Sequence, residues 1–470
     1  MQIDFYGAAK TVTGSKHLIT TPAGKKILLD CGLFQGRLPN RDDLNRHFGF
    51  DPTAIDCVVL SHAHIDHSGL LPALYRNGFR GTIYSTPATR SLCELMLFDS
   101  AHIQQDDLEY INARRRKNGG HMLTPLYDVE DVENVLNRFS TADYGEHLKI
   151  DNETTIHFTD AGHLLGSAAV HLDIKKDAHN VLKITYTGDI GRPNDPILRN
   201  PTPFRQPDIL ICESTYGNRL HPTAEKTEQT LLQIVHDVCV SNLGKLIIPA
   251  FSVDRTQELV YTLEKMFNSK LLPNIKIYVD SPLSVKATEV MKKHEECYNP
   301  EFLEYMHKHD PYPFAFSSLT YISDVEQSKL LNTLSDPCII ISASGMAEAG
   351  RIKHHIKNTI ENPNCAILMV GYCTPESLGG QLMAGRKTVR IFGEEFQVKA
   401  RVIDLEYFSS HADYSEIISY LSCIDPGKIQ RTFLVHGEYE AALQLKERML
   451  DKGFRHIHIP ELKESCSIDV

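Results

Sequence analysis

The sequence predicts an α/β protein of two domains that differ in their pattern of secondary structure. From about residue 207 to about residue 390, apolar runs alternate with segments of helical spacing, which is typical of a mostly parallel sheet flanked by helices. On both sides of this segment the chain consists of short strands that end in polar turns. Several of those strands are followed directly by histidine or aspartate, so the strand ends mark a candidate site.

The segment before residue 207 supplies the first elements. Its first 30 residues alternate like a β-meander, with a hairpin turn at Pro22-Ala23-Gly24. Further strands are expected where apolar and β-branched residues predominate, and helices where the spacing is helical. The strands are 57–60, 81–84, 156–163 (ending in Gly-His) and 182–189 (ending in Gly-Asp), and the helices are 70–76 and 86–97.

The central and C-terminal segments are read in the same way. Continuous apolar runs, as in buried parallel strands, occur at 208–212, 245–249, 275–279, 338–341 and 366–370. Helices are expected between them at 228–240, 255–267, 285–294 and 351–360. The C-terminal segment is expected to hold strands at 398–405 and at 431–438 (ending in His-Gly-Glu), and helices at 414–423 and 439–452.

A turn rich in potential metal ligands follows the strand at 57–60. It contains His62, His64, Asp66 and His67 within six residues. Imidazole nitrogens and carboxylate oxygens form the ligand set that zinc prefers among the common metals. A turn held by a buried strand is a rigid platform, so this stretch predicts a metal site.

Three later strands end in the same way, in His163, Asp189 and His436. Unrelated polar residues are the alternative for any one of them, but the repetition favours a common site. The number of side chains fits two metal ions, because a carboxylate has two oxygens and can bridge. The expected ligand sets are His62, His64 and His163 for one ion, and Asp66, His67 and His436 for the other, with Asp189 as the bridge.

Two further strand-end groups have less certain roles. His411 lies in a serine-rich turn and could be an eighth ligand or a proton donor, and Glu213 could orient it, since a histidine paired with a carboxylate has a fixed tautomer and a shifted pKa. Asp30 could bind metal, orient a ligand or cap its loop.

Composition restricts the class of protein. The chain has 470 residues, of which 42% are hydrophobic, and no N-terminal signal or long apolar run. We therefore expect a cytoplasmic protein that does not associate with membranes. The net charge of −11 argues against bulk binding of nucleic acid, although divalent metal ions would reverse the charge locally.

These motifs resemble those of the β-CASP nucleases, which have the metallo-β-lactamase fold, and the resemblance covers essentially the whole chain. The histidine turn, His163 and Asp189 match the metal motifs, and Asp30 matches a motif that supports the metal loop. The three motifs specific to the family resemble Glu213 in Cys-Glu-Ser-Thr-Tyr-Gly, His411 in Ser-Ser-His-Ala-Asp, and His436 in Val-His-Gly-Glu.

The resemblance implies an αββα sandwich with an inserted α/β β-CASP domain. We place the sandwich at 1–206 and 391–470 and the insert at 207–390. The chain departs from the family at two positions where relatives often have glycine-rich sequence. These are Asp254, in Phe-Ser-Val-Asp-Arg, and the acidic segment Ala347-Glu348-Ala349.

The resemblance also implies a function: hydrolysis of single-stranded RNA by a hydroxide activated by two zinc ions, since family members with histidine at the position of His436 act on RNA. Asp189 and Asp66 are then catalytic as well as metal ligands, with Asp66 as a further proton acceptor. His411, oriented by Glu213, is the expected proton donor to the leaving oxygen. A glycine-containing turn before a helix can hold a phosphate. The expected substrate-binding residues are Ser344, Gly345, Arg351 and Arg255.

Two alternatives stay open. One is a small-ester or thioester hydrolase on the same fold, although the inserted domain and the Glu213/His411 pair argue against it. The other is a non-catalytic RNA-binding scaffold, although scaffold members lose metal ligands and this chain keeps all seven. The sequence decides neither between endonuclease and 5′-exonuclease action nor whether the chain forms a homodimer, as related short enzymes do.

Overall fold

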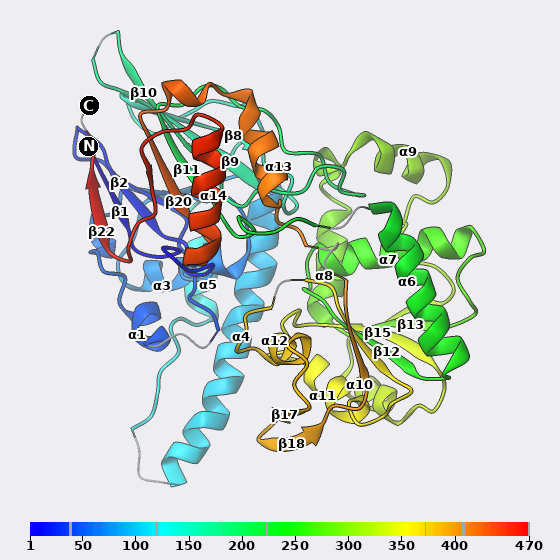
Figure 1. Ribbon diagram of the computed structural model, residues 1–470. Coiled ribbons are helices and arrows are strands. Elements are labelled where there is room, and N and C mark those ends of the chain that lie inside the picture. Colours follow the sequence, from blue (N-terminus) through cyan, green and yellow to red (C-terminus); the bar gives the residue numbers. More distant parts are fainter. Residues whose placement is uncertain are drawn as a thin grey trace. The chain divides into compact units, whose positions relative to one another are not determined.

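The computed structural model describes residues 1–36, 40–117, 121–177, 179–221, 224–371, 373–405 and 409–468. These residues form two compact units (Figure 1). The first unit comprises residues 1–220 and 411–470, and the second unit comprises residues 221–410. Each unit is described by itself below.

Two seven-stranded sheets form the centre of the described first unit. In spatial order, one sheet contains β22 (Glu464–Ser467), β1 (Gln2–Phe5), β2 (His17–Thr20), β3 (Lys26–Leu29), β4 (Cys57–Val59), β5 (Thr82–Ser85) and β6 (Phe139–Thr141). The other contains β21 (Ile457–His458), β20 (Arg431–Val435), β11 (Ile209–Glu213), β10 (Val181–Tyr186), β9 (Ala168–Lys175), β8 (Thr154–Asp160) and β7 (Leu148–Lys149).

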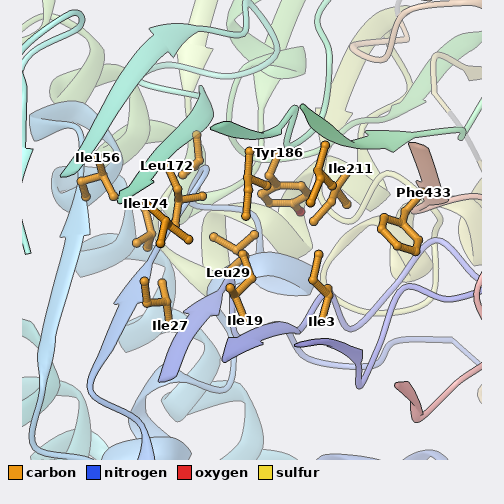
Figure 2. Close-up of a cluster of buried hydrophobic side chains, with 14 of the residues drawn as sticks. Ile3, Ile19, Ile27, Leu29, Ile156, Leu172, Ile174, Tyr186, Ile211 and Phe433 are labelled. Carbon is orange, nitrogen blue, oxygen red and sulfur yellow. The ribbon is translucent and has the colours of Figure 1, made fainter. Parts of the chain in front are cut away.

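The two sheets pack face to face through one apolar core. Figure 2 shows Ile19 and Leu29 of the first sheet facing Leu172 and Ile211 of the second. Successive residues of a strand point to opposite faces, so β11 also buries the other side of its sheet. Its Leu210 belongs to a separate apolar cluster.

Helices α13 (Tyr414–Tyr420) and α14 (Tyr439–Asp451) supply that second cluster and cover the outer face of the second sheet. The first sheet is accompanied by helices of the N-terminal segment: α1 (Arg41–Arg46), α2 (Ile65–Ser68), α3 (Leu71–Arg76), α4 (Pro87–Lys117) and α5 (Val129–Leu136). The expected α/β class with a sandwich of two sheets is confirmed. Helix α4 runs 20 residues beyond its expected end at 97.

The second unit contains a six-stranded sheet in which every strand pair is parallel. Its order is β14 (Leu319–Tyr321), β13 (Lys276–Val279), β15 (Cys338–Ser342), β12 (Lys245–Pro249), β16 (Ala366–Met369) and β19 (Arg401–Asp404). A separate hairpin joins β17 (Thr388–Ile391) and β18 (Glu394–Gln397). The helices are α6 (Ala224–Val235), α7 (Arg255–Asn268), α8 (Pro282–Met291), α9 (Pro300–Lys308), α10 (Val325–Thr333), α11 (Ile352–Thr359) and α12 (Leu378–Met383).

The compact units do not divide at the expected boundaries near 207 and 391. Strand β11 pairs in parallel with β10 and β20, which places it in the sandwich of the first unit. Strand β19 pairs in parallel with β16 in the second unit. The chain therefore changes units at 220/221 and 410/411, because the strands at both crossings belong to the sheet of the unit that they leave. In the described part of the chain, no helix is both long enough and apolar enough to cross a membrane.

Candidate metal centre

The histidine turn lies where β4 ends and α2 begins. His62 and His67 are fully buried, and the α2 backbone forms from Ile65 onward. The first residues of α2 are fixed by backbone hydrogen bonds from two other segments. Ser15 N–H donates to Asp66 O at 2.8 Å, and Leu33 N–H donates to Ile65 O at 2.9 Å. The turn is thus held from both sides by neighbouring segments.

The carboxylate of Asp30 fixes this turn through hydrogen bonds. Its Oδ1 accepts from Ser61 N–H at 2.7 Å, and its Oδ2 accepts from Ser61 Oγ at 2.8 Å, from His67 Nδ1 at 2.7 Å and from Tyr186 Oη at 2.7 Å. The carboxylate is fully buried, and its backbone has the left-handed φ of 57°. Because Asp30 fixes Nδ1 of His67, the opposite nitrogen Nε2 is left for another contact.

Four side chains form the first half of the site. His64 Nδ1 lies 3.1 Å from His62 Nε2 and 3.2 Å from His163 Nε2. Asp189 Oδ2 lies 3.4 Å from His62 Nε2 and 3.5 Å from His163 Nε2. The structure thus brings together the three histidines expected for the first ion and the expected bridging aspartate.

The second half shares Asp189. His67 Nε2 lies 3.3 Å from Asp189 Oδ2, and Asp66 Oδ2 lies 3.4 Å from His436 Nε2. His436 follows β20 with a left-handed φ of 48°. Its Nδ1 lies 3.5 Å from Asp189 Oδ1 and 3.1 Å from the hydroxyl of Thr215.

These spacings suit divalent metal ions. A tetrahedral ion with bonds of about 2.0–2.1 Å separates its ligand atoms by about 3.3–3.4 Å, and the distances above fall near that value. Two buried acceptors in the centre, His67 Nε2 and Asp189 Oδ1, have no hydrogen-bond partner among the described residues. The donor set therefore fits one or more metal ions.

Burial and neighbouring charges shift the pKa values of the ligands in different directions. Burial lowers the pKa of His62 well below its usual range and that of His64 to about 4. For Asp189, burial acts in the opposite direction, but the imidazoles of His436 and His67 outweigh it and hold its pKa well below the usual range. Burial opposes protonation of His67, but the carboxylates of Asp189 and Asp30 raise its pKa well above the usual range, so a metal ion at this ring must displace a proton.

His411 and Glu213 form a pair at the edge of this centre. Glu213 ends β11 with no exposed surface and accepts a short hydrogen bond from the backbone N–H of Ile190. Its Oε2 lies 3.2 Å from Nδ1 of His411, and that nitrogen lies 3.9 Å from Asp189 Oδ2. Burial opposes protonation of His411, but the carboxylates of Glu213 and Asp189 raise its pKa to about 9.

The four expected substrate-binding residues all lie in the second unit. Ser344 and Gly345 form the turn after β15, and Ser344 is partly exposed. Arg351 donates to Asp280 Oδ1 at 2.6 Å. Arg255 is only 4% exposed and pairs with Glu258 on its own helix. The part of Arg255 in binding phosphate stays a prediction.

Both departures from the family pattern lie at unusual backbone positions. Asp254 has φ of 69° and Ala347 has φ of 58°, in the left-handed region that glycine adopts without strain. Gly345 is needed for another reason: a Cβ there would lie 2.7 Å from the ring of Phe251. The glycine preference at these turns is therefore a backbone requirement.

Sequence reasoning missed three supporting residues, namely Ser61, Tyr186 and Thr215. Ser61 and Tyr186 bind Asp30, and Thr215 contacts both Nδ1 and the carbonyl oxygen of His436. Thr215 is 221 residues from His436. Its place two residues after Glu213 in a strand-end turn was the only available signal.

Comparisons with known proteins agree with this architecture. The chain matches three family models: the metallo-beta-lactamase superfamily domain over 19–206, the Beta-Casp domain over 256–382, and the Zn-dependent metallo-hydrolase RNA specificity domain over 395–460. The last two models account for the inserted and C-terminal segments of the chain.

Three relatives are similar over most of the chain. Ribonuclease TTHA0252 of Thermus thermophilus is 35% identical over 96% of this chain and 97% of its own length. An RNase J-like protein of Methanocaldococcus jannaschii is 30% identical over 93% and 92%. Transcription termination factor FttA of Methanosarcina mazei is 28% identical over 96% and 69%. The expected family is confirmed: the chain belongs to the β-CASP ribonucleases of the metallo-β-lactamase superfamily.

Proposed function

We propose that this chain is a metal-dependent ribonuclease that hydrolyses phosphodiester bonds of single-stranded RNA. The observation that carries the proposal is the convergence of seven potential ligands and the Glu213/His411 pair within the first unit. Relatives named as ribonucleases and the match to an RNA specificity domain support RNA as the substrate class.

In this proposal each chain binds two zinc ions. His62, His64 and His163 would hold one ion, and Asp189 would contribute to both ions. The second ion would be held by Asp66, His67 and His436. Two such ions supply activation of a water molecule and neutralisation of charge on the phosphate.

The protein contributes orientation and a proton. Asp30 fixes the imidazole of His67, and Thr215 contacts that of His436, so both rings are positioned before substrate binds. Glu213 holds Nδ1 of His411, and Nε2 of that ring is proposed to donate a proton to the leaving oxygen. Asp66 is also proposed to accept the proton of the attacking water.

RNA cleavage is tested with one single-stranded RNA carrying different labels at its 5′ and 3′ ends, assayed beside a panel of thioesters and lactones. The proposal predicts RNA cleavage that depends on added zinc and no comparable hydrolysis of the small esters. Internal fragments would indicate endonuclease action, and 5′ mononucleotides would indicate 5′-exonuclease action. Hydrolysis of the esters alone would favour the small-ester hydrolase.

Metal content distinguishes a catalytic ribonuclease from the non-catalytic RNA-binding scaffold. A catalytic centre predicts about two zinc ions at the ligands around Asp189 after dialysis against zinc, whereas a scaffold that binds RNA without cleaving it predicts fewer than one there. A homodimer and a cytoplasmic location are part of the same proposal. Light scattering of the purified chain and fractionation of the source cells test them.

A further inference from the structure

A second cluster of histidines lies in the sheet of the first unit that contains β8 and β9. His157 of β8 and His171 of β9 are directly opposite in the antiparallel register, and Asp173 lies two residues further along β9. Ile156 and Phe158 of β8 face the core between the sheets. Because side chains alternate along a strand, His157 points to the opposite face.

We propose that His147, His157 and Asp173 form an additional binding site for a divalent transition-metal ion, separate from the centre that contains Asp189. One ligand atom from each of the three residues lies within 4.8 Å of the others. The rings of His147 and His157 are 4.5 Å apart. The site shares no residue with the groups around Asp189.

The environment of His157 indicates that this side chain binds a metal ion. The residue is only 6% exposed, and its Nδ1 is buried with no hydrogen-bond partner among the described residues. An unpaired buried polar atom destabilises the folded protein. A bound metal ion would remove that cost, because the lone pair of Nδ1 would be coordinated.

The surroundings hold His157 in place. His171 stacks on it with ring centres 4.5 Å apart and planes inclined by 22°. Both nitrogens of His171 are occupied, since Nε2 lies 2.8 Å from Thr159 Oγ1 and Nδ1 lies 2.9 Å from Thr185 Oγ1. His171 is therefore a positioning residue and is not counted as a ligand.

The donor set defines the class of metal. Two imidazoles and one carboxylate suit zinc, cobalt, nickel or iron and leave coordination positions open for water. Magnesium and calcium prefer oxygen ligands throughout. Arg205 donates to Nε2 of His147 at 3.1 Å, so that nitrogen carries a lone pair. The metal must displace this guanidinium or use the other nitrogen, so we expect weaker binding than at the centre around Asp189.

The test uses the full chain and zinc alone as the probe. Wild type, a double variant with His147→Ala and Asp173→Asn, and a control with His47→Ala and Asp43→Asn are dialysed against low micromolar free zinc. The control removes another His–Asp pair, which is exposed on the surface and 3.3 Å apart. Zinc per chain is then measured by mass spectrometry, and RNA cleavage is measured in parallel.

The proposal predicts one zinc ion fewer per chain in the double variant than in wild type and control, with unchanged RNA cleavage. His157→Phe, which keeps the stacked ring, should show the same loss. Equal zinc content in all four proteins would overturn the proposal. This result is distinct from failure of the proposed ribonuclease activity, because the comparison depends on the difference in metal content and not on cleavage.

Discussion

Asp30→Asn is the most informative single change to the support of the metal centre. An asparagine has one carbonyl oxygen where aspartate has two acceptors. Its best orientation places that oxygen at the position of Oδ2, which receives three donors, and places the amide NH2 against Ser61 N–H. The variant therefore keeps three weakened hydrogen bonds. At the fourth contact the amide NH2 of asparagine faces the N–H of Ser61, so two donors meet without an acceptor.

The magnitude follows from those four contacts. Leaving the buried Ser61 N–H unsatisfied costs about 1–3 kcal/mol, and each of the other three bonds loses about 1 kcal/mol when its acceptor becomes neutral. The free energy of unfolding of the metal-free protein should fall by about 4–6 kcal/mol. Zinc affinity at the position of His67 should fall about 10–100-fold, because a neutral amide supports the imidazole less well than a carboxylate.

Urea unfolding of the metal-free protein and zinc titration measure the two effects. Asp56→Asn is the matched control, because Asp56 is an exposed carboxylate that accepts from Lys26 N–H at 2.8 Å. We expect it to cost no more than about 1 kcal/mol. If Asp30→Asn unfolds like this control and binds zinc like wild type, the role assigned to Asp30 is refuted.

Three further predictions concern other parts of the chain. His411→Ala should lower single-turnover RNA cleavage by about 10²–10⁴-fold, and adding Glu213→Gln should cause little further loss, since both act through one proton; additive losses would contradict the pairing. Burial raises the pKa of Asp160 to about 7, above its unfolded value of 3.8, so its ionisation removes stability as the pH rises from about 4 to 7. Asp160→Asn, which still accepts from Gly162 N–H, should be more stable than wild type by up to about 4 kcal/mol at pH 8 and equal to it near pH 4 in urea unfolding; a constant difference would refute this. Phe251 is 39% exposed beside the glycine turn, and Phe251→Trp would place the only tryptophan in the chain there. Its fluorescence should be quenched by single-stranded RNA if bases stack on this ring, and unchanged fluorescence at saturating RNA would exclude stacking.

Features that depend on residues close together in the chain could be predicted from the sequence. Each strand expected from an apolar run lies within a few residues of its place in the structure, although the eight-residue strand β9 was not expected. The polar residues that follow the expected strands are the potential ligands that the structure brings together around Asp189. A ligand at the end of a buried strand has little freedom, so position along the chain translates directly into position at the sheet edge.

Features that depend on distant partners were not predictable. The apolar run of β11 suits either sheet, and only its pairing with β10 and β20 assigns it to the sandwich. Tyr186 gave no signal, because its partner Asp30 is 156 residues away.

The central claim is that the ligand sets joined by Asp189 form one hydrolytic centre for RNA. The most direct measurement compares wild type with Asp189→Ala in cleavage of labelled single-stranded RNA at saturating zinc, with circular dichroism to verify the fold. We expect that the variant keeps its secondary structure, binds less zinc and does not cleave RNA. A folded Asp189→Ala protein with full activity would contradict it.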